Sequence, residues 1–235
     1  MKVLISVLDA DEAIEALAGG ADIIDVKDPT KGSLGAPSIA IVESVKRCLP
    51  RGITVSVALG DEPHGQVVKE LACAVEDRDV DYVKVGSLGL KSLDEAVDAY
   101  KEIRSRLNRA KLVVVAYADY GLNCCLNPFE LLRAAYKSDC EALMIDTLIK
   151  NGRSTFDYLS DSFLSKIIAE AHDMGLVFAL AGSLNLSHAD RVIALKPDVV
   201  GFRGAACSGD RVKGRVSRAS VKLIVKTYKP DNSLS

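Results

Sequence analysis

The sequence lacks any long hydrophobic run and carries little net charge. The longest apolar runs, such as Leu112 to Ala118, are far shorter than the roughly 20 residues that a membrane helix needs. In the first stretch, MKVLISVLDADEA, acidic residues come too early for a signal peptide. A formal net charge of -2, spread along the chain, offers no long-range attraction for nucleic acid or an anionic membrane. We therefore expect a cytoplasmic protein that binds neither.

Metal-binding and disulfide patterns are also missing. The six cysteines show no CxxC spacing, which predicts reduced thiols in a reducing compartment. Only three histidines occur, and none has a histidine or cysteine partner at metal-ligand spacing. We therefore expect no dedicated zinc site.

The pattern that is present predicts a barrel. Short apolar runs alternate with longer amphipathic segments about eight times, which is typical of a parallel sheet with helical crossovers. A chain of 235 residues has the usual size of one (β/α)₈ TIM barrel, roughly 250 residues. We predict a single α/β barrel domain over residues 1–228 and a polar tail over 229–235. An open doubly wound sheet is the alternative, but the first strand runs into SVLDADEA without the G-x-G-x-x-G of that fold.

The predicted elements alternate strictly along the chain. The strands are expected at Val3 to Ser6, Ile23 to Lys27, Thr54 to Ala58, Tyr82 to Val85, Leu112 to Ala118, Ala142 to Asp146, Val177 to Leu180 and Val199 to Arg203. The helices are expected at Asp11 to Leu17, Pro37 to Cys48, Gln66 to Asp77, Ser92 to Leu107, Pro128 to Lys137, Ser160 to Asp173, Ser187 to Ala194 and Ser217 to Tyr228.

The stretch ADIIDVKDPTKGSLGA places two charged residues on one face of an otherwise apolar strand. Because alternate strand residues share a face, Asp25 and Lys27 point one way while Ile24 and Val26 point the other. Burying an ammonium group is costly unless it is paired or performs chemistry. A buried ion pair between Lys27 and Asp25 is one explanation, and catalysis is the other.

Further charged residues end neighbouring strands, where barrel active sites lie. Val83 and Val85 flank Lys84, so the lysine faces away from these aliphatic neighbours, and the same alternation turns Asp146 inward. Two lysines in one cavity would disfavour each other's protonation, and one of them would be partly neutral near pH 7. A neutral amine can attack a carbonyl to form a Schiff base. A layer of satisfied salt bridges inside the barrel remains the alternative.

The loops after the seventh and eighth strands, ALAGSLNLS and RGAACSGDRVKGR, contain small residues with free backbone N–H groups. In this fold such loops commonly bind phosphate. Lys150, on the loop after the sixth strand, is a candidate for closing over the mouth, and a solvated loop lysine is the alternative. The phosphate candidates are Gly182, Ser183, Gly204 and Ala205, with Arg203 or Arg211 as the neutralising charge.

Several ordered motifs resemble one family over nearly the whole chain. GGADIIDVKDP, KGSLGA, DYVKVG, IDTLIKNG, FALAGS and DVVGFRGAACSGDR are similar to (5-formylfuran-3-yl)methyl phosphate synthases, also called 4-(hydroxymethyl)-2-furancarboxaldehyde-phosphate synthases. The resemblance implies a (β/α)₈ barrel without metal or organic cofactor that acts in methanofuran biosynthesis. It also implies that two molecules of glyceraldehyde 3-phosphate are joined into a furan phosphate, with loss of phosphate and water.

The same resemblance implies roles for individual residues. The family's Schiff-base lysine falls on Lys27 and its proton-accepting lysine on Lys84. Asp146 and Lys150 match the acidic and basic pair of the sixth loop, and Asp25 matches the acid of the second strand.

The fifth strand is a looser match. Ala116 stands where the family has glycine before Tyr-Ala-Asp, which leaves Asp119 without an assigned role. A class I aldolase or isomerase acting on a triose phosphate, or a non-catalytic barrel that binds a phosphorylated metabolite, is the alternative function. The expected partner is a small phosphorylated aldehyde, and a homo-oligomer is compatible with the sequence.

Overall fold

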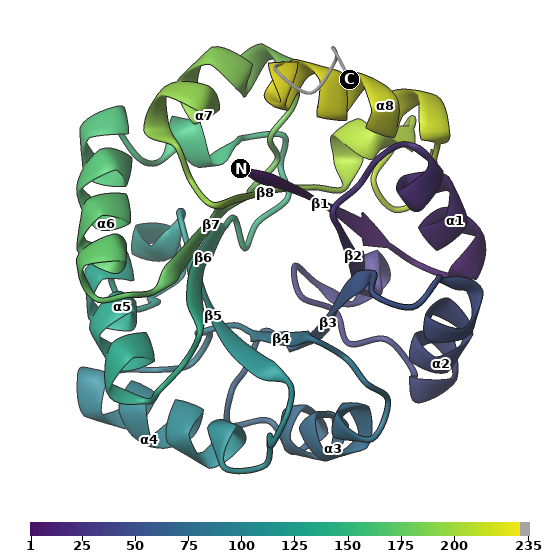
Figure 1. The fold of residues 1–235 in the computed structure, drawn as a ribbon. Helices are drawn as coiled ribbons and strands as arrows, with labels where there is room; N and C mark the ends of the chain where they lie inside the picture. The colour runs from purple at the N-terminus through teal and green to yellow at the C-terminus, as the bar shows by residue number, and fades with distance from the viewer. Residues whose placement is uncertain (231–235) are drawn as a thin grey trace.

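In the computed structural model, which describes residues 1–230, eight parallel strands close into a barrel surrounded by helices (Figure 1). Each strand pairs with the next in sequence, and β1 closes the ring on β8. The prediction of a (β/α)₈ barrel is therefore confirmed, and the open sheet is excluded. The strands are β1 (Lys2–Val7), β2 (Ile23–Val26), β3 (Thr54–Gly60), β4 (Tyr82–Val85), β5 (Lys111–Tyr117), β6 (Ala142–Asp146), β7 (Val177–Leu180) and β8 (Val199–Phe202).

The outer ring consists of helices that follow the strands in turn. A short hairpin of β9 (Cys207–Ser208) and β10 (Arg215–Val216) lies within the last connection. No helix among residues 1–230 combines the length and apolar character needed to span a membrane. The helices are α1 (Ala10–Ala18), α2 (Ile39–Cys48), α3 (Gln66–Glu76), α4 (Leu93–Arg104), α5 (Pro128–Lys137), α6 (Asp161–Asp173), α7 (Ala189–Leu195) and α8 (Arg218–Tyr228).

The predicted elements agree closely with the observed ones. The lysine of the second strand and the arginine of the eighth each lie one residue beyond the strand end. Of the predicted tail, residues 231–235 lie outside the described part of the chain, while Lys229 donates to Asp22 at 2.9 Å.

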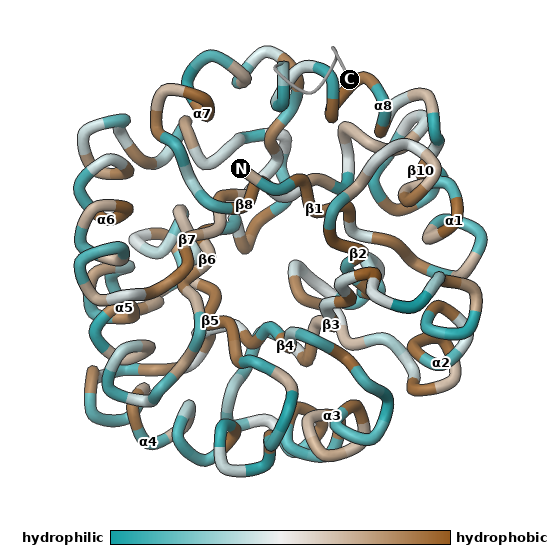
Figure 2. Tube along the Cα trace, viewed as in Figure 1, coloured by the Kyte–Doolittle hydropathy of each residue, from teal (hydrophilic) through white to brown (hydrophobic). Residues whose placement is uncertain are grey.

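The core has two parts, separated by the sheet. Outward strand residues such as Ile24, Val26, Val83 and Val85 pack with the buried faces of the helices. A smaller apolar cluster, which includes Met144, lines the lumen. Brown, hydrophobic stretches follow the strands, while the helices alternate brown and teal (Figure 2). The inward strand positions are therefore occupied by the apolar residues of the lumen cluster and by buried polar side chains.

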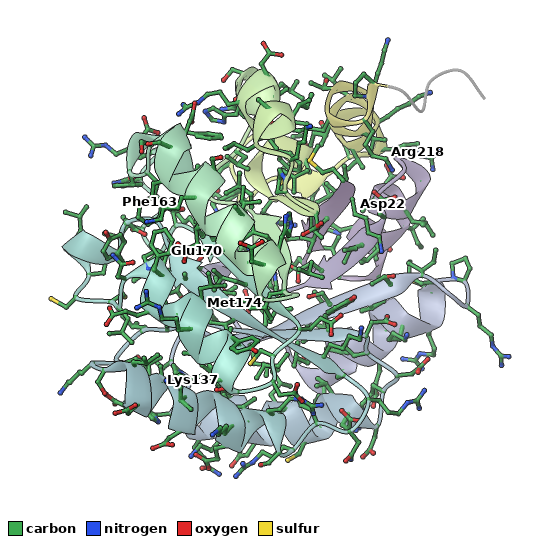
Figure 3. All side chains as sticks on the ribbon, turned by 60° about the vertical axis from the view of Figure 1, so that its left-hand side comes forward. Asp22, Lys137, Phe163, Glu170, Met174 and Arg218 are labelled. Atoms are coloured by element: carbon green, nitrogen blue, oxygen red, sulfur yellow. The ribbon has the colours of Figure 1, made fainter. Side chains whose placement is uncertain are left out.

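The helical ring presents charged side chains to solvent (Figure 3). Arg218 at the start of α8 donates to Glu15 of α1, which ties the last helix to the first. Within the ring α1 packs on both α2 and α8. This closed scaffold holds the carboxyl ends of the strands at fixed positions.

Candidate active site

A cavity of about 330 Å³ lies at the carboxyl ends of the strands, and we call it the carboxyl-end cavity. In a TIM barrel this end carries the active site. The predicted site residues that line it come from five different strand ends or loops. They are Lys27, Lys84, Asp146, Lys150, Gly182, Ser183, Arg203, Gly204 and Ala205. Lys27 and Lys84 therefore open into one compartment.

Asp25, the remaining predicted residue, is fully buried and does not line this cavity. Its Oδ2 accepts from Lys84 Nζ at 2.7 Å and from Ser6 Oγ at 2.8 Å. Of the two explanations offered for Lys27, the ion pair with Asp25 is not the one observed, because barrel closure brings Lys84 of β4 to the aspartate instead. Asp25 thus balances the charge of Lys84. Lys27 depends on other charged groups of the cavity, chiefly Asp146.

Lys27 is 4% exposed and donates from Nζ to the backbone oxygen of Ser33 at 3.2 Å. Burial lowers the pKa of this amine from its ordinary value of 10.5 to about 7. The charge of Asp146 opposes that change, while Lys84 and Lys150 add to it. A substantial neutral fraction near pH 7 makes Lys27 a competent amine nucleophile.

Asp146, at the end of β6, is paired with Lys150. Its Oδ1 accepts from Lys150 Nζ at 2.6 Å and from the backbone N–H of Thr147 at 2.7 Å. Burial alone would raise the pKa of the Asp146 carboxyl, but Lys150 and Lys27 lower it to about 2. Asp146 is therefore a fixed negative charge beside the two lysines.

Asp119, which the family resemblance left without an assigned role, holds the loop after β6. Its two carboxylate oxygens accept from the backbone N–H groups of Leu148 and Ile149 at 2.8 and 2.9 Å. Lys150 follows directly on this loop, and 15% of its side chain is exposed. It is docked on Asp146 inside the mouth rather than solvated.

The candidate phosphate loops line the same cavity. Gly182 has a φ of 95°, and a Cβ there would meet Thr155 Oγ1 at 2.1 Å, so only glycine fits. Ser183 adopts a φ of 52°. These positions expose backbone of the strand-seven loop to the cavity beside the small residues of the strand-eight loop.

The two arginines of this region differ. Arg203 forms a buried ion pair with Glu12 and donates to the backbone oxygens of Ser6 and Arg211 at 3.1 Å each. All three of its guanidinium nitrogens are engaged within the protein. In contrast, Arg211 lines the same cavity, and its buried Nη2 bonds to no atom of residues 1–230.

Asp61 was missed in the sequence analysis. Its Oδ1 accepts from the Tyr117 hydroxyl at 2.6 Å and from Leu34 N at 3.2 Å. Asp61 thereby fixes the loop whose Ser33 oxygen receives Lys27. Burial raises the pKa of its carboxyl. The sequence feature that could have identified Asp61 is its position directly after the third strand. Lys27 has the corresponding position after the second strand.

Comparisons with known proteins identify the family. A sequence model described as 4-HFC-P synthase matches residues 3–225. The (5-formylfuran-3-yl)methyl phosphate synthase of Methanococcus maripaludis strain C6 is 39% identical, covering 97% of this chain and 100% of its own length. The enzyme of the same name from Methanothermobacter thermautotrophicus is 40% identical, covering 94% of this chain and 96% of its own.

Solved structures show the same fold at low identity. Phosphoribosylanthranilate isomerase from Thermotoga maritima superposes with a TM-score of 0.64 at 15% identity, over 98% of this chain and 99% of that one. Thiamine phosphate pyrophosphorylase from Pyrococcus furiosus superposes with a TM-score of 0.66 at 17% identity, over 97% of this chain and 96% of that one. These likenesses concern architecture alone. The full-length sequence matches carry the assignment: the chain belongs to the 4-HFC-P synthase family.

Proposed function

We propose that this protein is an enzyme that condenses two molecules of glyceraldehyde 3-phosphate into (5-formylfuran-3-yl)methyl phosphate. The product comes from the names of its full-length relatives. The substrate and the covalent mechanism are our inference from the family resemblance and the site. The observation that carries the mechanism is a buried lysine, Lys27, whose pKa of about 7 leaves it partly neutral inside a cavity rich in other charges.

Lys27 begins the reaction by attacking the aldehyde of one triose phosphate. Loss of water from the adduct gives a protonated imine, which acidifies the adjacent C–H bond. Asp146 lies on the same cavity, and its negative charge stabilises the cationic imine. The ammonium of Lys150, held by Asp146, balances that carboxylate until substrate arrives.

Lys84 takes the proton from that carbon and leaves an enamine. To accept it, Lys84 must first release one of its own, and Asp25 Oδ2 is within 2.7 Å. The enamine expels the phosphate of its own triose, and the enol carbon formed in this way attacks the carbonyl of the second triose phosphate to make the carbon–carbon bond. Ring closure and loss of water give the aromatic furan, and hydrolysis of the imine releases the product aldehyde and frees Lys27.

The phosphate groups of the substrates bind at the loops after β7 and β8. Gly182, Ser183, Gly204 and Ala205 bring backbone to the cavity wall, and backbone N–H groups are good ligands for phosphate oxygens. Arg211 supplies the cationic partner, because Arg203 is committed to Glu12. Lys150 is our candidate for the second phosphate.

The test is incubation of the purified protein with glyceraldehyde 3-phosphate. We expect a new product with the mass of the furan phosphate and near-ultraviolet absorbance of a conjugated aldehyde, together with release of inorganic phosphate. A hexose bisphosphate would indicate an aldolase, and dihydroxyacetone phosphate an isomerase; either outcome alone contradicts the proposal.

A further inference from the structure

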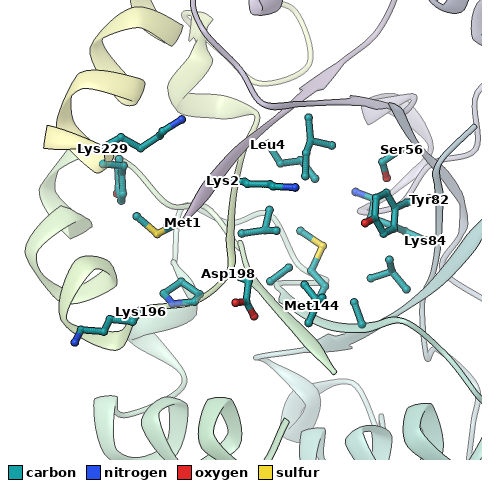
Figure 4. Close-up of a pocket in the computed structure, with 18 of the residues that line it drawn as sticks. Met1, Lys2, Leu4, Ser56, Tyr82, Lys84, Met144, Lys196, Asp198 and Lys229 are labelled. Atoms are coloured by element: carbon teal, nitrogen blue, oxygen red, sulfur yellow. The ribbon is translucent and has the colours of Figure 1, made fainter. Parts of the chain in front are cut away.

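A second cavity, of about 870 Å³, occupies the opposite end of the barrel, and we call it the amino-end cavity (Figure 4). The first residues of six strands line it, namely Lys2, Ile23, Tyr82, Ala142, Val177 and Val199. In TIM barrels this end usually serves stability, and layers of bulky branched side chains fill the lumen. Here the lumen is open from that end as far as Lys84.

Three residues line both cavities, Leu4, Lys84 and Met144. Figure 4 shows Lys84 on one wall of the amino-end cavity beside Ser56 and Tyr82, with Leu4 and Met144 also in view. The proposed catalytic base therefore lies at the partition between the substrate side and the opposite side of the barrel.

The partition contains a polar layer. Strand register places Ser6 beside Asp25, and Asp25 beside Ser56, on three neighbouring strands. Ser6 and Lys84 both donate to Asp25 Oδ2. The other carboxylate oxygen, Oδ1, and the hydroxyl of Ser56 are buried and bond to no atom within residues 1–230.

Buried polar atoms without a protein partner generally bind ordered water, provided that the site is polar and has room. The layer is polar, and Ser56 gives it a border with the amino-end cavity, although both unbonded atoms are themselves buried. A water bonded to Asp25 Oδ1 and Ser56 Oγ would have a carboxylate acceptor and a hydroxyl, and Ser56 would connect it to that cavity.

We propose that this layer is a water-binding site through which Lys84 exchanges its proton with bulk solvent by way of the amino-end cavity. The inference rests on the proposed function. The proton leaves the substrate carbon, joins Lys84 Nζ, and passes by Asp25 and the bound water to solvent, while the electron pair of the C–H bond becomes the enamine. No oxidant or reductant is involved.

A proton route through the amino-end cavity matters because bound substrate blocks the route to solvent through the carboxyl-end cavity. Two phosphorylated trioses fill much of a cavity of about 330 Å³ and exclude water from the carboxyl-end side. Exchange through the amino-end cavity lets Lys84 release its proton while substrate is bound.

A crystal structure of the resting enzyme tests the site directly. We expect ordered water within about 3 Å of both Ser56 Oγ and Asp25 Oδ1. A dry layer, with the two atoms bonded to neither water nor protein, would overturn the inference. This measurement does not depend on the reaction, so it stands even if the proposed function fails.

Solvent deuterium tests the route. With substrate in heavy water, the wild type should return unreacted substrate labelled at the carbon beside the imine. Ser56→Ala removes the hydroxyl, and Ala142→Leu narrows the amino-end cavity. In each variant Lys84 should return the original proton in about one third of abstractions, because its ammonium carries three equivalent hydrogens and two of them are already solvent deuterons. In the wild type, exchange with solvent should leave the original proton in very few of them.

Ser87→Ala is the matched control. Ser87 also carries a buried hydroxyl that bonds to no described atom, but it lines neither cavity. Borohydride trapping at Lys27 should be unchanged in all three variants, which checks folding and substrate binding. Equal labelling in the wild type, Ser56→Ala and Ala142→Leu would refute the route, whereas no trapping in the wild type would refute the proposed Schiff base instead.

Discussion

Lys84 Nζ and Asp25 Oδ2 lie 2.7 Å apart inside the barrel, with side-chain exposures of 3% and 0%. A buried ion pair is costly to break because the remaining charge has no partner and no water. This pair gives one lysine of the site a buried counter-charge and anchors it. The neighbouring lysine, Lys27, forms no such ion pair within residues 1–230, and burial lowers its pKa to about 7.

Removing the carboxylate from that pair should be strongly destabilising. Asp25→Asn leaves the ammonium of Lys84 buried without a counter-charge, and we expect a loss of about 3–5 kcal/mol in the free energy of unfolding. Urea denaturation measures it. Glu141→Gln is the control, because its pair with half-exposed Lys111 should contribute less than about 1 kcal/mol. Similar losses in both variants would refute the distinction.

The rate of imine formation should depend on pH through Lys27. Only the neutral amine attacks an aldehyde, so the rate should rise with pH, reach half its maximum near pH 7, and then level off. Asp146 raises the Lys27 pKa, so Asp146→Asn should move the midpoint to lower pH. Stopped-flow trapping across pH measures both. A midpoint near 10.5, the ordinary lysine value, would contradict this account.

The same pKa predicts a trend in stability. Between pH 7 and 10.5 the unfolded chain binds more protons at Lys27 than the folded chain does. The contribution of this residue to the free energy of unfolding therefore becomes more favourable as pH rises through that window. Lys27→Met should flatten the rise, as measured by urea denaturation at several pH values. An unchanged slope in this variant would argue against a lowered pKa.

Arg211 should contribute to substrate affinity rather than to folding. Arg211→Gln removes a charge-assisted contact with phosphate, and we expect KM to rise roughly tenfold or more, with little change in stability. Steady-state kinetics and thermal denaturation separate the two effects. Lys213→Gln, an exposed neighbour, is the control and should leave KM unchanged. If Arg203→Gln raised KM while folding normally and Arg211→Gln did not, the assignment would be reversed.

Asp119 should act through the loop after β6. Asp119→Ala leaves the N–H groups of Leu148 and Ile149 without their acceptor, at a cost of about 1–3 kcal/mol, and releases the loop that carries Lys150. We expect KM to rise while borohydride trapping at Lys27 persists. Asp119→Asn keeps one carbonyl oxygen and should have a smaller effect. Equal and complete loss of trapping in both variants would instead indicate a direct catalytic role.

Much of the architecture was predictable because the signals are local. Alternation of apolar and polar residues placed Lys27, Lys84 and Asp146 on inward faces, and the structure confirms that they share one cavity. Short apolar runs separated by amphipathic segments were sufficient to predict the barrel.

The pairings were less predictable because they join residues far apart in sequence. Asp25 pairs with Lys84 across 59 positions, and Glu12 with Arg203 across 191. The first pairing depends on β3 and β4 following β2 in the ring, and the second on β1 closing against β8. Asp61 was missed for the same reason, since its partner Tyr117 is 56 positions away.

The most direct test of the central claim is borohydride reduction of the protein in the presence of glyceraldehyde 3-phosphate, followed by peptide mass spectrometry. We predict a covalent triose adduct on Lys27 in the wild type and none in Lys27→Arg, which keeps the charge but cannot form the imine. An adduct on another lysine, or turnover to the furan phosphate without any adduct on Lys27, would contradict the account.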